Sequence, residues 1–484
     1  MPHPRLAVRS PTALFIGGVW AKPATQRTLE VISPTTEEVL LQVPEATERD
    51  IDRAVAAARA AFDTGPWPRL TAAERSAYLL RIADNLEQRA AELANAWTGQ
   101  MGAPISLTRM LVPQAPTLFR FYGKLIAAHP LIDERTRDDG RVARIVKEPV
   151  GVVAAITPWN APLILLCYKV AAALAAGCTV VSKPSPETPV DAYLLAECIE
   201  AAGVPPGVFN VLPAGREVGD YLIRHPGIDK ISFTGSSAAG KHIAAVAAER
   251  LTRASFELGG KSAAVILPSA DIGRTLESLA PFSMPLTGQA CFSLTRILAP
   301  RSREQEITDA YIAAVRQVRV GDPFEATTQM GPLSMARQLA RVLGYIETGR
   351  KEGARLALGG ARPAAFSRGY FVEPTVFTGV DNSMTIAQEE IFGPVVCIIP
   401  YDGVDEAVSI ANDTRYGLHG AVYSSDPEEG FAVARRIRSG SVAINGLSVD
   451  PKMPFGGFKE SGLGREGGIE GLDPYFEIKT VYMP

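Results

Sequence analysis

One cysteine and one glutamate stand in turns that could expose them to a substrate. Cys291 ends the run Gly288-Gln289-Ala290-Cys291, whose small residues leave room for a carbon atom to approach the sulfur. Glu257 is followed by Leu258 and two glycines, which can leave its carboxylate facing an open cavity. A thiolate attacks carbonyl carbons and a carboxylate can activate water, and the two need to meet in space rather than in sequence. Because a single cysteine is usually a core residue, the pair needs support from the rest of the chain.

The composition is that of a globular protein with two or three domains. The chain has 484 residues, of which 46% are hydrophobic and 21% charged, and its formal net charge is −3. This charge and the lack of a sustained basic run give no reason to expect nucleic acid or a membrane surface as a partner. The longest apolar run, residues 170–181, is about half the length that crosses a bilayer. No apolar signal core follows Met1, so we expect a cytoplasmic protein.

The cysteines argue against a metal centre. They are five in number, at positions 167, 178, 198, 291 and 397, and no two form a Cys-x-x-Cys pair. An odd count without such a pair is not typical of a disulfide framework or of a structural zinc site. We therefore expect reduced thiols and no metal.

An alternation of short strands and helices begins at residue 150. Strands are expected at residues 150–156, 179–183, 208–212 and 230–234, and helices at residues 162–176, 190–202 and 218–224. This rhythm predicts the α/β class, with a doubly wound parallel sheet that binds ligands at the carboxyl ends of its strands. The polar or exposed residues at those ends are Thr157, Pro158, Trp159, Asn160, Lys183, Ser185, Gly235 and Ser236.

Two of these strand ends have simpler interpretations. Residues 235–240, Gly-Ser-Ser-Ala-Ala-Gly, open a helix, and free amides there favour a phosphate group. The run is neither a Gly-x-Gly-x-x-Gly fingerprint nor a P-loop, so by itself it is more often a tight turn. Asn160, before Ala161 and Pro162, also suits a helix N-cap.

The remaining segments predict scaffold helices and an arm. Residues 1–13 resemble a loose leader, and a short strand begins at Leu14. Helices are expected to begin near Thr47 and Thr71, where capping pairs stand, and to cover residues 116–127. Asp139-Gly140 is a hairpin signal within residues 132–146, and the alternating residues 475–482 supply a third strand that this marginal hairpin needs.

Seven short motifs occur in one order along the chain, and they include most of the residues named above. The chain carries Thr157-Pro158-Trp159-Asn160, Lys183-Pro184, Phe233-Thr234-Gly235-Ser236, Glu257-Leu258-Gly259-Gly260-Lys261, Gly288-Gln289-x-Cys291, Glu390-Ile391-Phe392-Gly393-Pro394 and Pro454-Phe455-Gly456-Gly457. In order and spacing they resemble the NAD(P)-dependent aldehyde dehydrogenase superfamily, of the non-acylating, hydrolytic type. The resemblance runs from about Leu14 to the C-terminus.

The resemblance implies oxidation of an aldehyde to a carboxylic acid with NAD, or with NADP. Cys291 would form a thiohemiacetal and then a thioester, while the Asn160 amide and the Cys291 N–H hold the oxyanion. Glu257 would activate the hydrolytic water, and Lys169 would support the catalytic groups. The implied cofactor ligands are Thr157, Pro158, Trp159, Lys183, Ser185, Gly235, Ser236, Leu258, Gly259, Glu390 and Phe392. The implied pocket, Leu165, Tyr168, Phe292 and Phe455, favours an apolar aldehyde, aromatic or of medium chain length.

The family fold implies three parts and an assembly. We expect a dinucleotide-binding domain at residues 1–125 and 146–256, a catalytic α/β domain at residues 257–460, and a β oligomerisation arm at residues 126–145 and 461–484. The exposed strand edges of such an arm favour a homodimer or homotetramer. One departure concerns the cofactor: many members carry a glutamate three residues after the lysine, and Pro186 stands there with Glu187 following.

Three alternatives stay open. A dehydrogenase that passes the acyl group to coenzyme A would keep the cysteine, but a hydrolytic base at Glu257 argues against it. A phosphorylating dehydrogenase would need a Cys-His pair, and the histidine nearest to Cys291 in sequence is His242. A binding or structural protein could have kept the fold without turnover, although drift would have no reason to spare Cys291, Glu257 and Asn160 together.

Overall fold

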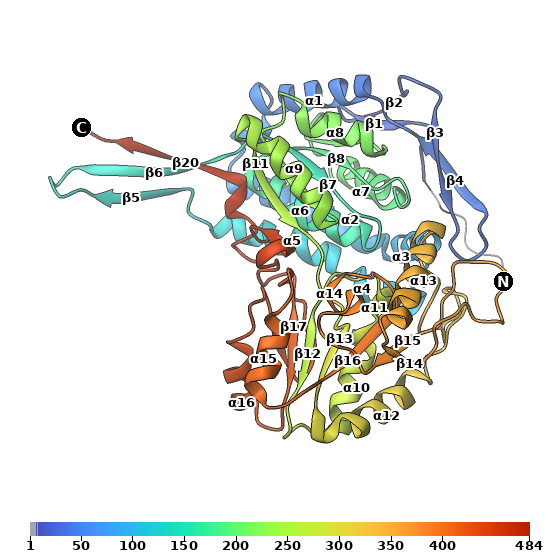
Figure 1. Cartoon of the computed structure of the whole chain (residues 1–484). Coiled ribbons are helices and arrows are strands. Elements are labelled where there is room, and N and C mark those ends of the chain that lie inside the picture. Colours follow the sequence, from blue (N-terminus) through green and yellow to red (C-terminus); the bar gives the residue numbers. More distant parts are fainter. Residues whose placement is uncertain (1–5, 7) are drawn as a thin grey trace.

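Two lobes and a projecting arm make up the computed structural model (Figure 1). It describes residue 6 and residues 8–484. Part of the expected leader, residues 1–5 and 7, therefore lies outside the described residues. The first lobe and the second are each built on one large sheet, and the arm carries a smaller sheet of its own.

The first lobe contains an eight-stranded sheet whose five central strands are parallel. Nearly all residues of these strands are buried, as expected for apolar runs covered on both faces. In spatial order the strands are β19 (Gly462–Leu463), β11 (Arg253–Glu257), β10 (Lys230–Thr234), β7 (Val152–Ile156), β8 (Thr179–Lys183), β9 (Phe209–Val211), β1 (Leu14–Ile16) and β2 (Val19–Ala21).

Helices cover both faces of this sheet, which makes it doubly wound. One hydrophobic cluster joins it to α2 (Ala72–Gln88), α3 (Ala90–Met101), α5 (Gln114–Ala128), α6 (Pro162–Ala176) and α7 (Val190–Ala201), and a second joins it to α1 (Glu48–Asp63), α8 (Arg216–Arg224) and α9 (Ser237–Arg250). The short α4 (Ile105–Leu111) follows α3. Thr47 and Thr71 form capping boxes at the starts of α1 and α2, as predicted.

The second lobe repeats the α/β pattern. Its seven strands, parallel except for β14, are β14 (Arg355–Leu358), β15 (Thr375–Thr378), β16 (Val395–Tyr401), β13 (Arg296–Pro300), β12 (Ala263–Ile266), β17 (Gly420–Tyr423) and β18 (Ala443–Ile444). The helices are α10 (Ile272–Ser283), α11 (Pro285–Gly288), α12 (Glu304–Val315), α13 (Ala336–Lys351), α14 (Thr385–Gln388), α15 (Val404–Asn412) and α16 (Pro427–Ala434). Two further hydrophobic clusters pack this sheet against its helices.

The arm is a three-stranded antiparallel sheet that projects from the body (Figure 1). β5 (Ile132–Thr136) and β6 (Val142–Pro149) form the predicted hairpin, with Gly140 at a φ of +80° in its turn. β20 (Phe476–Tyr482) pairs with β6, which confirms the origin of the third strand. A separate two-stranded ribbon, β3 (Thr28–Ile32) and β4 (Val39–Pro44), lies near the N-terminus.

The expected bounds of β8, β10 and α6 match the structure. The limits of the three expected domains stay predictions. One strand lies outside the part to which we assigned it. Gly462–Leu463, which we placed in the arm, forms β19 and pairs with Phe256 and Glu257 at the edge of the first sheet. This edge strand brings the segment after residue 461 against the end of β11.

Candidate active site

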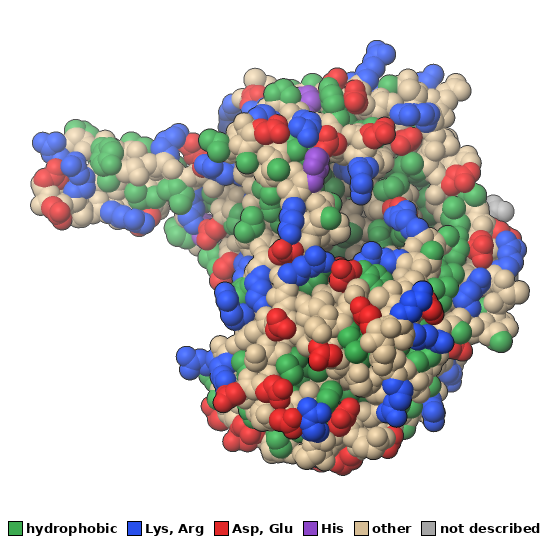
Figure 2. Space-filling view, viewed as in Figure 1, with side chains coloured by type: hydrophobic (Ala, Val, Ile, Leu, Met, Phe, Trp, Pro, Cys, Tyr) green, Lys and Arg blue, Asp and Glu red, His purple; other side chains and the backbone are tan. Residues whose placement is uncertain are grey.

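A cavity of about 1230 Å³ opens where the parallel strands β7, β8 and β10 end. Figure 2 shows a hollow between the two lobes on this face. Most of the sequence-predicted residues line the cavity: Thr157, Pro158, Trp159, Asn160, Leu165, Lys183, Ser185, Gly235, Ser236, Leu258, Gly259, Cys291, Glu390 and Phe392. Five others, Glu257, Lys169, Tyr168, Phe292 and Phe455, are not part of this lining.

Cys291 lies on the cavity wall and is half-buried. Its loop follows α11, where Leu286 and Thr287 adopt left-handed backbone conformations. A Cβ atom at Gly260 would lie 2.3 Å from the Cys291 carbonyl oxygen. The second glycine after Glu257 therefore allows the turn that follows β11 to pack directly on the cysteine loop.

Asn160 is held next to the same loop. Its Nδ2 donates to the Gln289 carbonyl oxygen at 2.9 Å, two residues before the cysteine. Its own carbonyl oxygen accepts a hydrogen bond of 2.9 Å from Trp97 Nε1. The N-cap interpretation of Asn160 was wrong, because α6 has Ala161 at its N-cap position and Pro162 as its first residue. The Asn160 amide is thus directed to the cysteine loop instead of the helix start.

Glu257 is the last residue of β11 and is buried. The backbone of Gly456 passes close to its carboxyl group. A Cβ atom at Gly456, where φ is +152°, would lie 2.5 Å from Glu257 Oε1. Among the described residues, Glu257 Oε2 is buried without a hydrogen-bond partner. Burial and the nearby Glu466 carboxyl hold the pKa of Glu257 well above its ordinary value, while Lys169 and Arg465 oppose the shift. In its ionised form this carboxylate is therefore a stronger base than a solvent-exposed glutamate.

Lys169 and Glu466 form a buried ion pair behind Glu257. The Lys169 side chain is fully buried and that of Glu466 is 5% exposed. Lys169 Nζ also donates to Thr234 Oγ1 at 2.7 Å, at the end of β10. Sequence reasoning missed Glu466, which is 297 residues from Lys169 and stands in no motif that we recognised. Only the fold brings the two together.

The surroundings of Cys291 favour the neutral thiol over the thiolate. Burial raises its pKa, and the carboxyl groups of Glu390 and Glu257 raise it further. A thiolate at this position needs a group that accepts the proton. Burial also raises the pKa of Glu390 to about 7, although Glu390 Oε1 accepts a 2.9 Å hydrogen bond from the Gly260 N–H.

The other end of the cavity offers donors to a phosphorylated ligand. Ser236 is the N-cap of α9, and Ala238 and Ala239 of its first turn line the cavity. Lys183 Nζ is held by the carbonyl oxygens of Ala214 at 2.7 Å and Pro184 at 3.2 Å, which leaves one of its three N–H groups for a ligand. Burial lowers the pKa of Lys183 to about 8.

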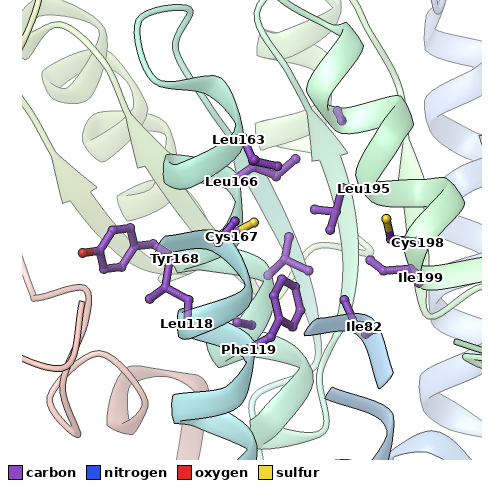
Figure 3. Close-up of a cluster of buried hydrophobic side chains, with 14 of the residues drawn as sticks. Ile82, Leu118, Phe119, Leu163, Leu166, Cys167, Tyr168, Leu195, Cys198 and Ile199 are labelled. Atoms are coloured by element: carbon purple, nitrogen blue, oxygen red, sulfur yellow. The ribbon is translucent and has the colours of Figure 1, made fainter. Parts of the chain in front are cut away.

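Several aromatic side chains lie on segments that also carry the predicted catalytic residues or their neighbours. Trp159 and Phe392 meet edge to face, with ring centroids 5.3 Å apart. Phe455 pairs with Glu466 through two backbone hydrogen bonds, which places it beside the buried ion pair. Tyr168 points away from the core residues of α6, such as Cys167 (Figure 3), and its hydroxyl has no partner among the described residues. Phe292 lies near His419, with ring centroids 6.5 Å apart.

Several cavity residues escaped the sequence reasoning. Arg216 and His242 come from α8 and α9, and Arg337, Gln338 and Arg341 come from α13 of the second lobe. Arg216 and His242 could have been found in the sequence, because they lie on helices that follow the ends of parallel strands. Nothing in the sequence relates α13 to the first sheet. The expected cofactor site is therefore completed by the second lobe.

Two kinds of feature are absent from the part of the chain that is described. None of its helices combines the length and apolar character needed to cross a membrane. None of its clusters of three or more histidine, cysteine, aspartate or glutamate side chains is arranged to hold a metal ion.

Known proteins resemble this chain over almost its full length. The family model of the Aldehyde dehydrogenase family matches residues 20–481. A geranial dehydrogenase of Castellaniella defragrans is 46% identical over 97% of this chain and 98% of its own. A 3-succinoylsemialdehyde-pyridine dehydrogenase of a Pseudomonas species is 43% identical over 96% of this chain and 97% of its own.

Solved structures agree with the sequence relatives. The Mycobacterium tuberculosis aldehyde dehydrogenase in complex with NAD+ superposes with a TM-score of 0.97 at 44% identity, covering 99% of both chains. A cysteine-to-alanine mutant of aldehyde dehydrogenase C from Pseudomonas syringae, in complex with NAD+ and octanal, gives a TM-score of 0.95 at 42% identity, over 99% of this chain and 98% of its own. The family and fold predicted from the seven motifs are thereby confirmed, and this chain belongs to the aldehyde dehydrogenase family.

Proposed function

We propose that the protein oxidises an aldehyde to the carboxylic acid with NAD+, by covalent catalysis at Cys291. One observation carries this proposal. Cys291 and Asn160 both line the cavity, and the Asn160 amide is hydrogen-bonded to the loop that carries the cysteine. The turn after Glu257 packs on the same loop through Gly260. These contacts support a nucleophile, an oxyanion donor and a base acting together, which acyl transfer through a thioester needs.

The first stage forms a bond between sulfur and the aldehyde carbon. The Cys291 proton must leave as the sulfur attacks, and the high pKa of Glu257 makes its carboxylate a strong acceptor for that proton. The aldehyde oxygen becomes an oxyanion, which the Asn160 amide and the Cys291 N–H stabilise once the amide turns from Gln289 to the substrate. When bound, a nicotinamide would supply the hydride acceptor, and loss of hydride from the thiohemiacetal would leave the acyl group on Cys291 as a thioester.

The second stage hydrolyses the thioester. Glu257 first releases the Cys291 proton to solvent and then takes a proton from water, and the resulting hydroxide adds to the acyl carbon. The carbon–sulfur bond breaks, and Glu257 returns its proton to the leaving sulfur, which gives the acid and the Cys291 thiol. The Glu257 oxygen that lacks a partner is available to hold this water. Lys169 and Glu466 form an ion pair next to Glu257 and act on its pKa in opposite directions: Glu466 raises it and Lys169 lowers it.

The residues of the cavity fit a dinucleotide. Thr157 Oγ1 is buried without a partner among the described residues, and Lys183 has an N–H group to spare. The first turn of α9 offers backbone amides to a pyrophosphate, as helix starts do. Glu390 and Phe392 would hold the ring that lies nearest to Cys291. Both solved structures described above contain NAD+, which supports NAD as the cofactor here.

An apolar aldehyde suits the pocket best. Leu165 lines the cavity. We assign Tyr168, Phe292 and Phe455 to the same pocket, because Phe292 follows Cys291 in sequence and Phe455 is hydrogen-bonded through its backbone to Glu466, next to the proposed base. A charged group would lose its hydration among these side chains. Two of the similar proteins support this choice, because one is a geranial dehydrogenase and one solved structure holds octanal.

The test is reduced-nicotinamide absorbance with the purified protein and NAD+. Octanal and benzaldehyde should give a kcat/KM at least about tenfold higher than succinate semialdehyde or betaine aldehyde, the discrimination expected from desolvating one charge. Cys291→Ala should abolish the signal with every aldehyde. Activity confined to charged aldehydes would refute the substrate class, and full activity of Cys291→Ala would refute the mechanism.

We further propose that the enzyme is a cytoplasmic homodimer or homotetramer assembled through the arm. All five cysteines are free, in keeping with a reducing compartment. On the arm, Ile132, Ile478 and Tyr482 expose 56%, 68% and 69% of their surface. Exposed apolar residues on a narrow sheet with open edges favour pairing with another chain.

A further inference from the structure

The turn before Cys291 has a backbone conformation that most residues avoid. Leu286, Thr287 and Gly288 follow one another in the left-handed region, with φ angles of 52°, 61° and 71°. For the two residues that carry a Cβ atom this conformation is unfavourable, so it persists only where surrounding contacts hold it. A Cβ atom at Gly288 would lie 2.1 Å from the Gly393 carbonyl oxygen, so the turn also packs closely on the backbone of the second lobe.

The side chain of Gln289 holds this turn from inside. It is fully buried, and its Nε2 donates to the Leu286 carbonyl oxygen at 2.9 Å. Its Oε1 accepts a hydrogen bond of 2.9 Å from the Ser334 N–H. Because the amide serves a carbonyl group and an N–H group at once, an apolar side chain of the same length cannot replace it. The turn is thus tied to Ser334, 45 residues further along the chain.

Ser334 connects the turn to α13, which is hydrogen-bonded to the backbone around Glu390. Ser334 lies two residues before the start of α13. On this helix, Gln338 Nε2 donates to the Phe392 carbonyl oxygen at 2.6 Å, and Arg341 Nη2 donates to the Glu390 carbonyl oxygen at 2.7 Å. Gln338 and Arg341 both line the cavity. Contiguous hydrogen bonds therefore hold the cysteine turn and the segment around Glu390 together.

The main chain of Gln289 contacts the second proposed catalytic group. Its carbonyl oxygen accepts the 2.9 Å hydrogen bond from Asn160 Nδ2. Cys291 follows two residues later, and Cys291 and Asn160 both line the cavity. The placement of the thiol relative to the Asn160 amide thus depends on how Gln289 is held.

We propose that Gln289 is a positioning residue for Cys291. Its side-chain amide keeps the left-handed turn in place, and the turn aligns the thiol with the Asn160 amide that stabilises the oxyanion. Gln289 does not line the cavity, so it acts through its neighbours. This inference rests on the proposed function, which gives Cys291 and Asn160 their roles.

Gln289→Met tests the role, because methionine has a similar length and lacks both hydrogen-bonding groups. Amide hydrogen exchange should become about tenfold faster in the peptides that cover residues 286–291 and 332–336, because each segment loses one hydrogen bond. The kcat/KM for octanal should fall about 100-fold, the loss expected when a nucleophile is displaced by about 1 Å. The dissociation constant of NAD+ should stay within about threefold of the wild-type value, since the substitution removes no group that lines the cavity.

Asn412→Leu is the matched control. The Asn412 amide also bridges two backbone groups: its Nδ2 donates to the Arg436 carbonyl oxygen at 2.9 Å, and its Oδ1 accepts from the Arg438 N–H at 2.7 Å. It lies at the end of α15 and does not line the cavity. Both variants should unfold at a lower temperature than the wild type, but Asn412→Leu should keep kcat/KM within about threefold of the wild-type value.

Two further measurements separate positioning from a general loss of stability. In an Asn160→Ala background, Gln289→Met should lower kcat/KM less than about tenfold, because the amide with which the thiol must align is gone. Gln289→Glu keeps a donor for the Leu286 carbonyl oxygen only while its carboxyl group is neutral, and burial favours the neutral form. The activity of Gln289→Glu relative to the wild type should therefore fall as the pH rises.

The inference fails if Gln289→Met keeps kcat/KM within about threefold of the wild-type value, or if its loss and that of Asn160→Ala multiply in the double variant. It also fails if hydrogen exchange at residues 332–336 is unchanged, or if the relative activity of Gln289→Glu does not depend on pH. Hydrogen exchange and NAD+ binding need no turnover. A wild-type protein that oxidises no aldehyde, with the expected exchange in Gln289→Met, would refute the proposed function alone.

Discussion

Glu466→Gln tests how the buried ion pair controls Glu257. The substitution keeps the shape of the side chain and removes its negative charge, so the fully buried Lys169 loses its counterion. Burial is the main cause of the raised Glu257 pKa, and Glu466 is the next. Without Glu466, the pKa of Glu257 falls toward its ordinary value, and the unpaired Lys169 charge lowers it further.

The variant should change stability and pH dependence together. Removing one partner of a buried pair costs about 3–5 kcal/mol, because an uncompensated charge remains in the interior. In the proposed mechanism Glu257 acts as a base in its ionised form, so the rate should rise as the pH passes its pKa. A lower pKa moves this rising limb of kcat to lower pH in Glu466→Gln.

Thermal unfolding and the pH profile of kcat measure the two effects. Glu477→Gln is the matched control, because it breaks an ion pair with Arg253 in which both side chains are about half exposed, and such pairs contribute about 1 kcal/mol or less. Replacing both partners, Lys169→Met with Glu466→Leu, should recover much of the lost stability. A rising limb that stays in place or moves to higher pH in Glu466→Gln would refute the reasoning.

Other variants test the remaining parts of the site and the arm. Asn160→Ala should lower kcat/KM about 100- to 1000-fold by removing an oxyanion donor, and a loss below tenfold would contradict that role. Gly456→Ala places a Cβ atom 2.5 Å from Glu257 Oε1, and the displaced carboxyl should lower kcat about 100-fold with 5′-AMP binding preserved. Ile478→Lys puts a charge on a side chain that is 68% exposed on the arm, and sedimentation should show smaller assemblies than for the wild type. Unchanged sedimentation would place the interface elsewhere.

Local patterns were enough to predict the strands and the helix that line the cavity in the first lobe. β8, β10 and α6 follow from apolar runs with polar ends, and the capping boxes at Thr47 and Thr71 follow from residue spacing. The arm was predictable because Asp139-Gly140 requires a turn and the C-terminal strand alternates. These signals act within a few residues, which is the range over which sequence patterns determine structure.

Contacts between distant segments could not be predicted in this way. Glu466 reaches Lys169 only because β19 pairs with β11 and carries the following residues to the end of the first sheet. Arg337 comes from a helix of the second lobe, and its pairing with Glu187 depends on how the two lobes meet. Asn160 looked like an N-cap because its neighbours suit one, yet its amide is held by the carbonyl group of Gln289. Tertiary contacts decided each of these cases.

The thioester at Cys291 is the central claim, and mass spectrometry of the Glu257→Gln variant tests it most directly. This variant keeps the nucleophile and lacks the base for hydrolysis, so octanal and NAD+ should add one octanoyl group per chain. Digestion should locate that group on the peptide that contains Cys291, and Cys291→Ala should carry none. An acyl group on another residue, or turnover by wild-type protein with no acyl group trapped in Glu257→Gln, would contradict the account.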